Sequence, residues 1–121
     1  MKAYVFAGVF FCCSVTTAQA QNCYVPGFSG VDNSTAIGYM TVKAGKICGV
    51  TRIGGDGMMV TGTRIVGRPR AGKVGLTPTA IRYMPQPGYV GPDGFTFQNQ
   101  GRNRFGQATV RTIRMQVNVV P

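Results

Sequence analysis

The sequence contains no histidine and no glutamate, and its only acidic residues are three aspartates. Histidine and glutamate are among the side chains that most often move protons in enzymes, and histidine is a frequent zinc ligand. Without them, the chain offers no pair of groups suited to general acid–base catalysis. We therefore predict that the protein is not an enzyme and that it needs no cofactor and no metal ion.

The three aspartates are far apart in the sequence. Asp32 precedes an Asn-Ser pair, Asp56 lies in a glycine-rich run, and Asp93 stands between a proline and a glycine. Such surroundings are typical of turns, in which an aspartate accepts bonds from nearby backbone amides. Calcium binding is the functional alternative, but it requires several oxygen ligands that converge. We predict that all three are turn residues.

Long helical periodicity is also missing. No stretch of a dozen residues spaces apolar side chains at three and four positions without interruption by the 18 glycines and 7 prolines. This pattern disfavours helices, and short β-rich runs alternate instead with turn residues. The glycine-rich residues 54–57 are predicted to form a hairpin turn. A phosphate-binding loop is the weaker interpretation, because no Lys-Ser or Lys-Thr pair and no helix follow them.

The alternation predicts seven to eight strands in one domain that spans residues 21–121. They lie at residues 23–25, 36–43, 47–53, 58–66, 73–76, 80–84, 95–97 and 108–120. In the last run, every second residue from Ile113 to Val119 is apolar, and the residues between them are polar. This outline indicates an all-β, immunoglobulin-like antiparallel β-sandwich. A small barrel is the competing architecture, because strand count alone does not separate the two.

The first twenty residues have the organisation of a signal peptide. Lys2 supplies a positive start, residues 3–15 are apolar, and Ala18-Gln19-Ala20 has the small-x-small form of a cleavage site. The apolar run is shorter than the roughly 20 residues needed to span a bilayer. Lipidation at one of the cysteines within the run is disfavoured, because the small residue that normally precedes a lipidated cysteine is absent. We predict cleavage after Ala20 and export to the periplasm or the cell exterior.

Cleavage would leave two cysteines, Cys23 and Cys48. In an exported chain without histidine, this pair predicts a disulfide bond. A redox-active pair is the alternative, but the close Cys-x-x-Cys spacing of such sites is absent. The bridge would stabilise the fold by roughly 3 kcal/mol on the chain-entropy estimate.

Residues 83–97 combine aromatic rings with prolines and glycines. Pro85 restricts the backbone, the glycines permit conformations barred to other residues, and Asp93 can hold a turn. The rings can bury large areas and pack edge to face. We predict that this segment is an ordered crossover between two sheets, with its rings inward and a strand resuming at residues 95–97.

The spacing Tyr83-x-Pro85-x-x-Gly88-Tyr89-x-Gly91-x-Asp93-x-Phe95-Thr96-Phe97 resembles a signature of bacterial immunoglobulin-like and cadherin-like repeat domains. The family usually has Phe and Tyr where this chain has Tyr89 and Phe97. Residues 65–74 resemble the family's strand-turn-strand element, although Ala71 stands where histidine is common. Residues 44–48 are similar to a segment of short, single-domain secreted relatives.

The resemblance covers residues 58–120 and implies a fold that adhesins and envelope or extracellular proteins use as a spacer or binding unit. It implies no conserved chemistry, because fold does not fix function. The residues that it marks as structural are Tyr83, Pro85, Gly88, Tyr89, Gly91, Asp93, Phe95 and Phe97.

The chain carries a formal net charge of +10, and loss of Lys2 on cleavage would leave +9. Most of its basic residues are arginine, whose fork suits phosphate and carboxylate. The candidate anion-binding residues form two clusters in the sequence: Arg64, Arg68, Arg70 and Lys73, and then Arg102, Arg104, Arg111 and Arg114. A solvated basic surface that limits aggregation is the competing interpretation. Aromatic residues are not clearly interleaved with these arginines, which leaves a dedicated nucleic-acid site unsupported.

These observations predict a non-enzymatic, exported binding or envelope-associated structural module whose partner the sequence does not identify. The alternative is a cationic protein that binds lipopolysaccharide, acidic polysaccharide or nucleic acid through its arginine clusters. An enzyme inhibitor is a third class, since the missing histidine does not argue against inhibition.

Overall fold

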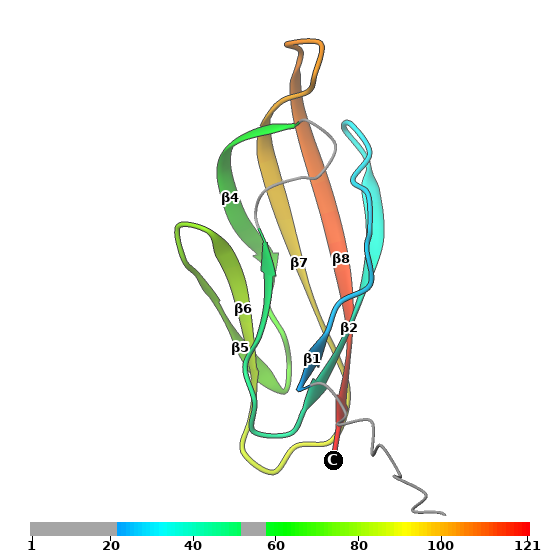
Figure 1. Cartoon of the computed structure of the whole chain (residues 1–121), viewed down its shortest axis with the longest axis vertical. Helices are drawn as coiled ribbons and strands as arrows, with labels where there is room; N and C mark the ends of the chain where they lie inside the picture. Colours follow the sequence, from blue (N-terminus) through cyan, green and yellow to red (C-terminus); the bar gives the residue numbers. More distant parts are fainter. Residues whose placement is uncertain (1–21, 52–57) are drawn as a thin grey trace, which may run out of the picture.

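The structure is a computed structural model that describes residues 22–51 and 58–121 (Figure 1). Its strands are β1 Cys23–Tyr24, β2 Thr35–Lys43, β3 Cys48–Thr51, β4 Met59–Gly67, β5 Gly72–Leu76, β6 Ala80–Pro85, β7 Gly91–Arg102 and β8 Ala108–Val120. The two described ranges contain strands and no helix, so the all-β prediction is confirmed. Within them, no helix is long and apolar enough to cross a membrane. The predicted signal peptide and the predicted turn at residues 54–57 lie outside the described residues.

The strands form two sheets. The larger sheet has the order β1-β2-β8-β7-β4, and the smaller one has the order β3-β6-β5. Neighbouring strands run antiparallel except β2 and β8, which are parallel from Thr35 opposite Thr112 to Lys43 opposite Val120. The long strands β7 and β8 continue into a hairpin at the top of Figure 1, beyond the ends of the other strands.

The alternation of side chains sets which face of each strand is buried. In β8, Ile113, Met115, Val117 and Val119 are at most 3% exposed. The polar residues between them, such as Arg114, face solvent. Because successive side chains of a strand point to opposite faces, a strictly alternating sequence leaves only one register that buries the apolar set. The predicted faces of this strand are confirmed.

One hydrophobic core draws on both sheets. Its largest fully buried side chains are Tyr83, Phe97, Met40, Ile81 and Met115. The Tyr83 and Phe95 rings lie 5.8 Å apart at an interplanar angle of 13°, so the smaller sheet packs on the larger one through stacked rings. Phe95 and Phe97 are stacked at 29°. The prediction that these rings point inward is confirmed, but they stack face to face rather than edge to face.

Residues 86–90 cross from β6 in the smaller sheet to β7 in the larger one. The predicted crossover is therefore present, but it is shorter than predicted. Strand β7 begins at Gly91, four positions before Phe95, because Gly91 and its neighbours pair with β8 in spite of their glycines and proline. Gly91 has a φ of 136°, a conformation that favours glycine. Pro85 ends β6 in a buried position.

The predicted disulfide joins Cys23 to Cys48, with 5.1 Å between their Cα atoms. Cys23 lies on β1 of the larger sheet and Cys48 on β3 of the smaller one, where it is fully buried. The bond therefore connects the two sheets at the start of the described chain, in addition to the core contacts.

Candidate binding site

Asp93 connects three parts of the fold. Its Oδ1 accepts hydrogen bonds from the backbone amides of Gly94 (2.9 Å) and Arg70 (3.0 Å). Its Oδ2 accepts them from the Tyr83 hydroxyl (2.6 Å) and the Ala71 amide (3.2 Å). The turn prediction for Asp93 is wrong, because the residue lies within β7, where it pairs with Val117 of β8, and only the bond from Gly94 is local. The others come from the β4–β5 connection and from β6, so Asp93 holds both of them against the start of β7.

The Tyr83 hydroxyl is the buried partner in this arrangement. Burial raises the pKa of Tyr83 far above the usual tyrosine value, and the hydrogen bond to Asp93 raises it further. Both effects favour the neutral hydroxyl, which keeps its proton and donates a hydrogen bond to the Asp93 carboxylate. The arrangement is therefore suited to structure and not to proton transfer near neutral pH.

Asp32 is held by the β7–β8 hairpin rather than by its own loop. Its Oδ2 accepts a bond from Asn103 Nδ2 (2.9 Å), and its Oδ1 accepts bonds from the Thr109 hydroxyl (3.0 Å) and from Arg111 Nε (2.9 Å). The hydrogen bond from Asn103, followed by those from Arg111 and Thr109, lowers the pKa of Asp32. This network fixes the loop between β1 and β2 to the base of the hairpin.

Arg111 binds Asp32 within this network. Its guanidinium also forms an ion pair with Asp32 at 2.8 Å, and its side chain is only 12% exposed. A cation that already has a carboxylate partner offers little to a further anion. Although Arg111 is one of the candidate anion-binding residues, its position indicates a structural role.

The remaining arginines of the second cluster separate in space. Arg102 donates a 2.7 Å bond to the Gly106 carbonyl oxygen, and the Arg104 guanidinium lies 4.9 Å from the centre of the Phe105 ring. Both arginines belong to the hairpin at the top of Figure 1. Arg114 instead lies on the outer face of the larger sheet, well along β8.

The first cluster also divides. Arg64 points outward from β4 of the larger sheet, where its Nε and one terminal nitrogen donate 3.0 and 2.9 Å bonds to the Gln98 side-chain oxygen. Lys73 lies on β5 of the smaller sheet, and Arg68 and Arg70 lie in the connection between the two sheets. Residues that are close in the sequence therefore face different surfaces.

Arg68 and Arg114, one from each cluster, meet at a hollow of about 220 Å³ on the larger sheet. We refer to it as the Arg68–Arg114 hollow; its other lining residues are Gly67, Asp93, Gly94, Phe95, Thr96, Met115 and Gln116. The sequence marked the two arginines but not Thr96 or Gln116 as site residues. The alternation of Thr96 and Gln116 with apolar neighbours indicated that both face outward. No local pattern indicated that they would lie beside Arg68 and Arg114.

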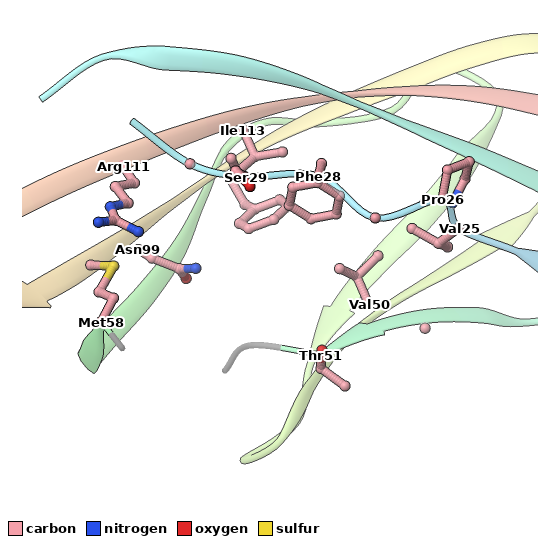
Figure 2. Close-up of a pocket in the computed structure, with 14 residues that line it drawn as sticks. Val25, Pro26, Phe28, Ser29, Val50, Thr51, Met58, Asn99, Arg111 and Ile113 are labelled. Atoms are coloured by element: carbon pink, nitrogen blue, oxygen red, sulfur yellow. The ribbon is translucent and has the colours of Figure 1, made fainter. Parts of the chain in front are cut away.

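A larger and mostly apolar pocket of about 560 Å³ lies between the β1–β2 loop, β3 and β8. Figure 2 shows Phe28, Val50 and Ile113 along its wall, with Asn99 and Arg111 at one end. The described residues that line it include no acid, and their hydroxyl groups are those of Ser29 and Thr51. Thr51 and Met58 also line this pocket.

The described residues include no group of three or more histidine, cysteine, aspartate or glutamate side chains that could hold a metal ion. The features that the described chain does present are two sheets tied by a disulfide and a basic hollow on the larger sheet. They define a disulfide-linked, all-β protein of two sheets. No protein-family model and no curated protein matches the chain.

Proposed function

We propose that the protein is an exported, non-enzymatic binding or envelope-associated module with an immunoglobulin-like β-sandwich fold. The observation that carries this proposal is the strand order. If β3 to β8 are taken as the second to seventh strands of such a domain, β3, β6 and β5 correspond to its B-E-D sheet, and β4, β7 and β8 to its C-F-G sheet. The first long strand, β2, joins the sheet of β8.

The disulfide supports export but differs from that of antibody domains. Antibody domains link their second and sixth strands, whereas Cys23 on β1 is linked to Cys48 on β3. Disulfides persist in oxidising compartments, which fits the signal-peptide pattern of the first residues. The signature residues Tyr83 and Asp93 have structural contacts, which fits a module whose function lies on its surface.

Export is tested by mass spectrometry of the protein recovered from separated cytoplasmic, periplasmic and culture fractions. We expect a species that begins at Gln21 and resists alkylation until it is reduced. An uncleaved, thiol-bearing protein in the cytoplasm would contradict the proposal.

A second candidate function is binding of anionic polymers, and the distribution of charge favours it. Asp32 and Asp93, two of the three acidic residues, have their carboxylates bonded within the fold. Arg64, Arg68 and Arg114 are exposed, and the partner of Arg64 is a neutral amide that leaves its charge in place. A surface that exposes more positive than negative charge attracts anions.

Anion binding is tested by retention on heparin, lipopolysaccharide and DNA matrices over a range of NaCl concentrations. We expect retention at low salt that falls steeply as salt rises, because counterions compete for the arginines. A neutral dextran matrix is the control. Passage through all three anionic matrices without delay would overturn this second function.

A further inference from the structure

Two of the residues that line the Arg68–Arg114 hollow are glycine, and neither has free space for a Cβ. A Cβ on Gly67 would lie 3.2 Å from the Cβ of Thr96 on the paired strand, and a Cβ on Gly94 would lie 3.1 Å from the Met115 carbonyl oxygen. Both separations are tighter than ordinary contacts. A side chain at either position would therefore displace its neighbours and narrow the hollow.

The charge around the hollow is positive. Arg68 and Arg114 line it and are exposed, and Arg64 lies on the same outer face of the larger sheet. Asp93 also borders it, but both of its oxygens accept bonds from within the fold, including one from the buried Tyr83. An anion that enters the hollow would thus meet two arginine forks and a carboxylate whose oxygens are already occupied by hydrogen bonds.

Neutral polar groups complete the hollow. Thr96, which carries a hydroxyl, and Gln116, which carries an amide, line it together with Arg114. A neighbouring row of side chains is ordered by hydrogen bonds: Arg64 binds Gln98, and Gln98 Nε2 donates a 3.2 Å bond to the Thr112 hydroxyl. Amides and hydroxyls both donate and accept hydrogen bonds, which suits a ligand rich in hydroxyl groups.

An exposed aromatic ring lies next to these groups. The parallel register of β2 and β8 places Tyr39 opposite Gln116 and Ile37 opposite Arg114. Tyr39 is 55% exposed. Strand spacing and rise put its Cα within about 8 Å of that of Arg114. Sequence alone left the arginines without an aromatic neighbour on an exposed face, and this long-range pairing supplies one.

We propose that the Arg68–Arg114 hollow binds an acidic sugar residue of an anionic polysaccharide. The two arginines bind its carboxylate, Gln116 and Thr96 bind its hydroxyls, and Tyr39 packs against the next sugar ring. This inference rests on the second proposed function and assigns it a ligand class and a site. The mixture of amides, hydroxyls and a neighbouring ring favours a sugar over single-stranded nucleic acid, which is bound through successive stacked bases.

The test is calorimetric titration of the purified, disulfide-bonded protein with tetragalacturonate at low ionic strength. The double variant Arg68→Gln/Arg114→Gln is expected to bind roughly ten- to a hundredfold more weakly, the range expected when charge-assisted hydrogen bonds are lost. The control is Arg82→Gln/Arg104→Gln, which removes the same charge from the smaller sheet and the hairpin tip. It is expected to change the affinity by no more than about twofold, as for charges far from the contact.

The contribution of the ring is tested separately. Tyr39→Thr is expected to weaken binding by about three- to tenfold, the range for one aromatic contact, whereas Tyr39→Phe should retain most of the affinity. Equal affinities of the Tyr39→Thr and Tyr39→Phe variants would show that the ring of Tyr39 does not contact the ligand.

Three outcomes would overturn the proposal. Equal losses in the two arginine double variants would show that net charge alone governs binding, and would leave general anion binding intact. Tighter binding of an oligothymidylate of equal charge would show that the occupant is nucleic acid. Retention on anionic matrices without any affinity for tetragalacturonate would exclude the acidic sugar. If the protein binds none of the anionic matrices, the second proposed function, binding of anionic polymers, is itself rejected.

Circular dichroism checks that each variant keeps the wild-type fold. If Arg68→Gln/Arg114→Gln unfolds, the single variant Arg114→Gln replaces it, because it still removes one charged donor from the hollow. Weaker binding by this variant than by the wild type supports the site, and unchanged binding overturns it.

Discussion

At the scale of single residues, Asp93 shows how one carboxylate can organise a fold. The sequence predicted a turn residue, but Asp93 lies within β7, and only its bond from the Gly94 amide is local. Its partners Arg70 and Tyr83 lie in other elements. Their identity could not be predicted, because a neighbouring glycine and proline mark a turn but carry no information on distant donors.

The first prediction concerns the hydroxyl of Tyr83. Tyr83→Phe leaves Asp93 without its bond from this buried donor, and we expect the free energy of unfolding to fall by about 2 kcal/mol. Tyr39→Phe is the matched control, because it removes an exposed hydroxyl and should change stability by less than about 0.5 kcal/mol. Urea unfolding at neutral pH measures both. Equal losses would show that the Tyr83–Asp93 bond adds no stability.

The same hydroxyl predicts sensitivity to alkaline pH. Burial, followed by the hydrogen bond to Asp93, raises the pKa of Tyr83 in the folded protein, so loss of its proton favours the unfolded chain. The stability that depends on it is present below pH about 10, the ordinary tyrosine value, and is lost progressively above it. Tyr83→Phe should show a smaller alkaline loss than the wild type. Parallel stability curves for the two proteins above that pH would contradict this assignment.

At the scale of elements, the strands and their buried faces could be predicted, and their partners could not. Every second residue of β8 from Ile113 to Val119 is buried, as the alternating pattern required. The parallel pairing of β2 with β8 joins segments at opposite ends of the described chain, and no local pattern encodes it. The Arg68–Arg114 hollow depends on such pairings. The sequence therefore identified the two arginines as candidates but did not predict that they lie side by side.

The packing of β5 against β6 yields a matched pair of substitutions. A Cβ on Gly72 would lie 2.6 Å from the Met84 carbonyl oxygen and 2.7 Å from the Tyr83 ring, whereas a Cβ on Gly75 would meet nothing within 4 Å. We expect Gly72→Ala to destabilise the protein by about 1–3 kcal/mol and Gly75→Ala to have little effect. Urea midpoints measure the difference. Equal midpoints would mean that β5 lies farther from β6 than the structure shows.

The contact between the β1–β2 loop and the hairpin predicts sensitivity to acid. Hydrogen bonds, the largest from Asn103, lower the pKa of Asp32, so its charged form stabilises the fold above pH about 4 and ceases to do so as the pH falls through the lowered value. The wild type should therefore be more stable than Asp32→Asn near pH 6, and the difference should shrink towards pH about 2. A difference that stays constant over this range would exclude the charge as its cause.

At the scale of the whole molecule, composition predicted both the disulfide and the positive charge. It predicted where the disulfide forms, but not where the charge lies on the surface. The disulfide was predictable because two cysteines have few other uses in a chain whose first residues have the pattern of a signal peptide, and it joins the two sheets. The basic charge was equally visible in the sequence, but its distribution was not. Folding commits Arg111 to Asp32 and brings Arg68 to Arg114, so residues grouped by sequence have different roles in space.

Reduction tests the contribution of the disulfide to stability. The bond closes a loop with a sequence separation of 25 residues, and we expect reduction to lower the free energy of unfolding by roughly 3 kcal/mol. Urea unfolding with and without dithiothreitol measures this loss. An unchanged midpoint, with both thiols shown to be free, would mean that core packing alone holds the two sheets together.

The central claim is that the protein is a binding module whose site is the Arg68–Arg114 hollow, and an NMR titration of the wild type with tetragalacturonate tests it most directly. The predicted result is a set of saturable shifts in the backbone amides of Gly67, Gly94, Thr96 and Gln116, which line the hollow. The signals of the hairpin at residues 103–107 should remain in place. Shifts spread evenly over both sheets and the hairpin, or no shifts at all, would contradict the claim.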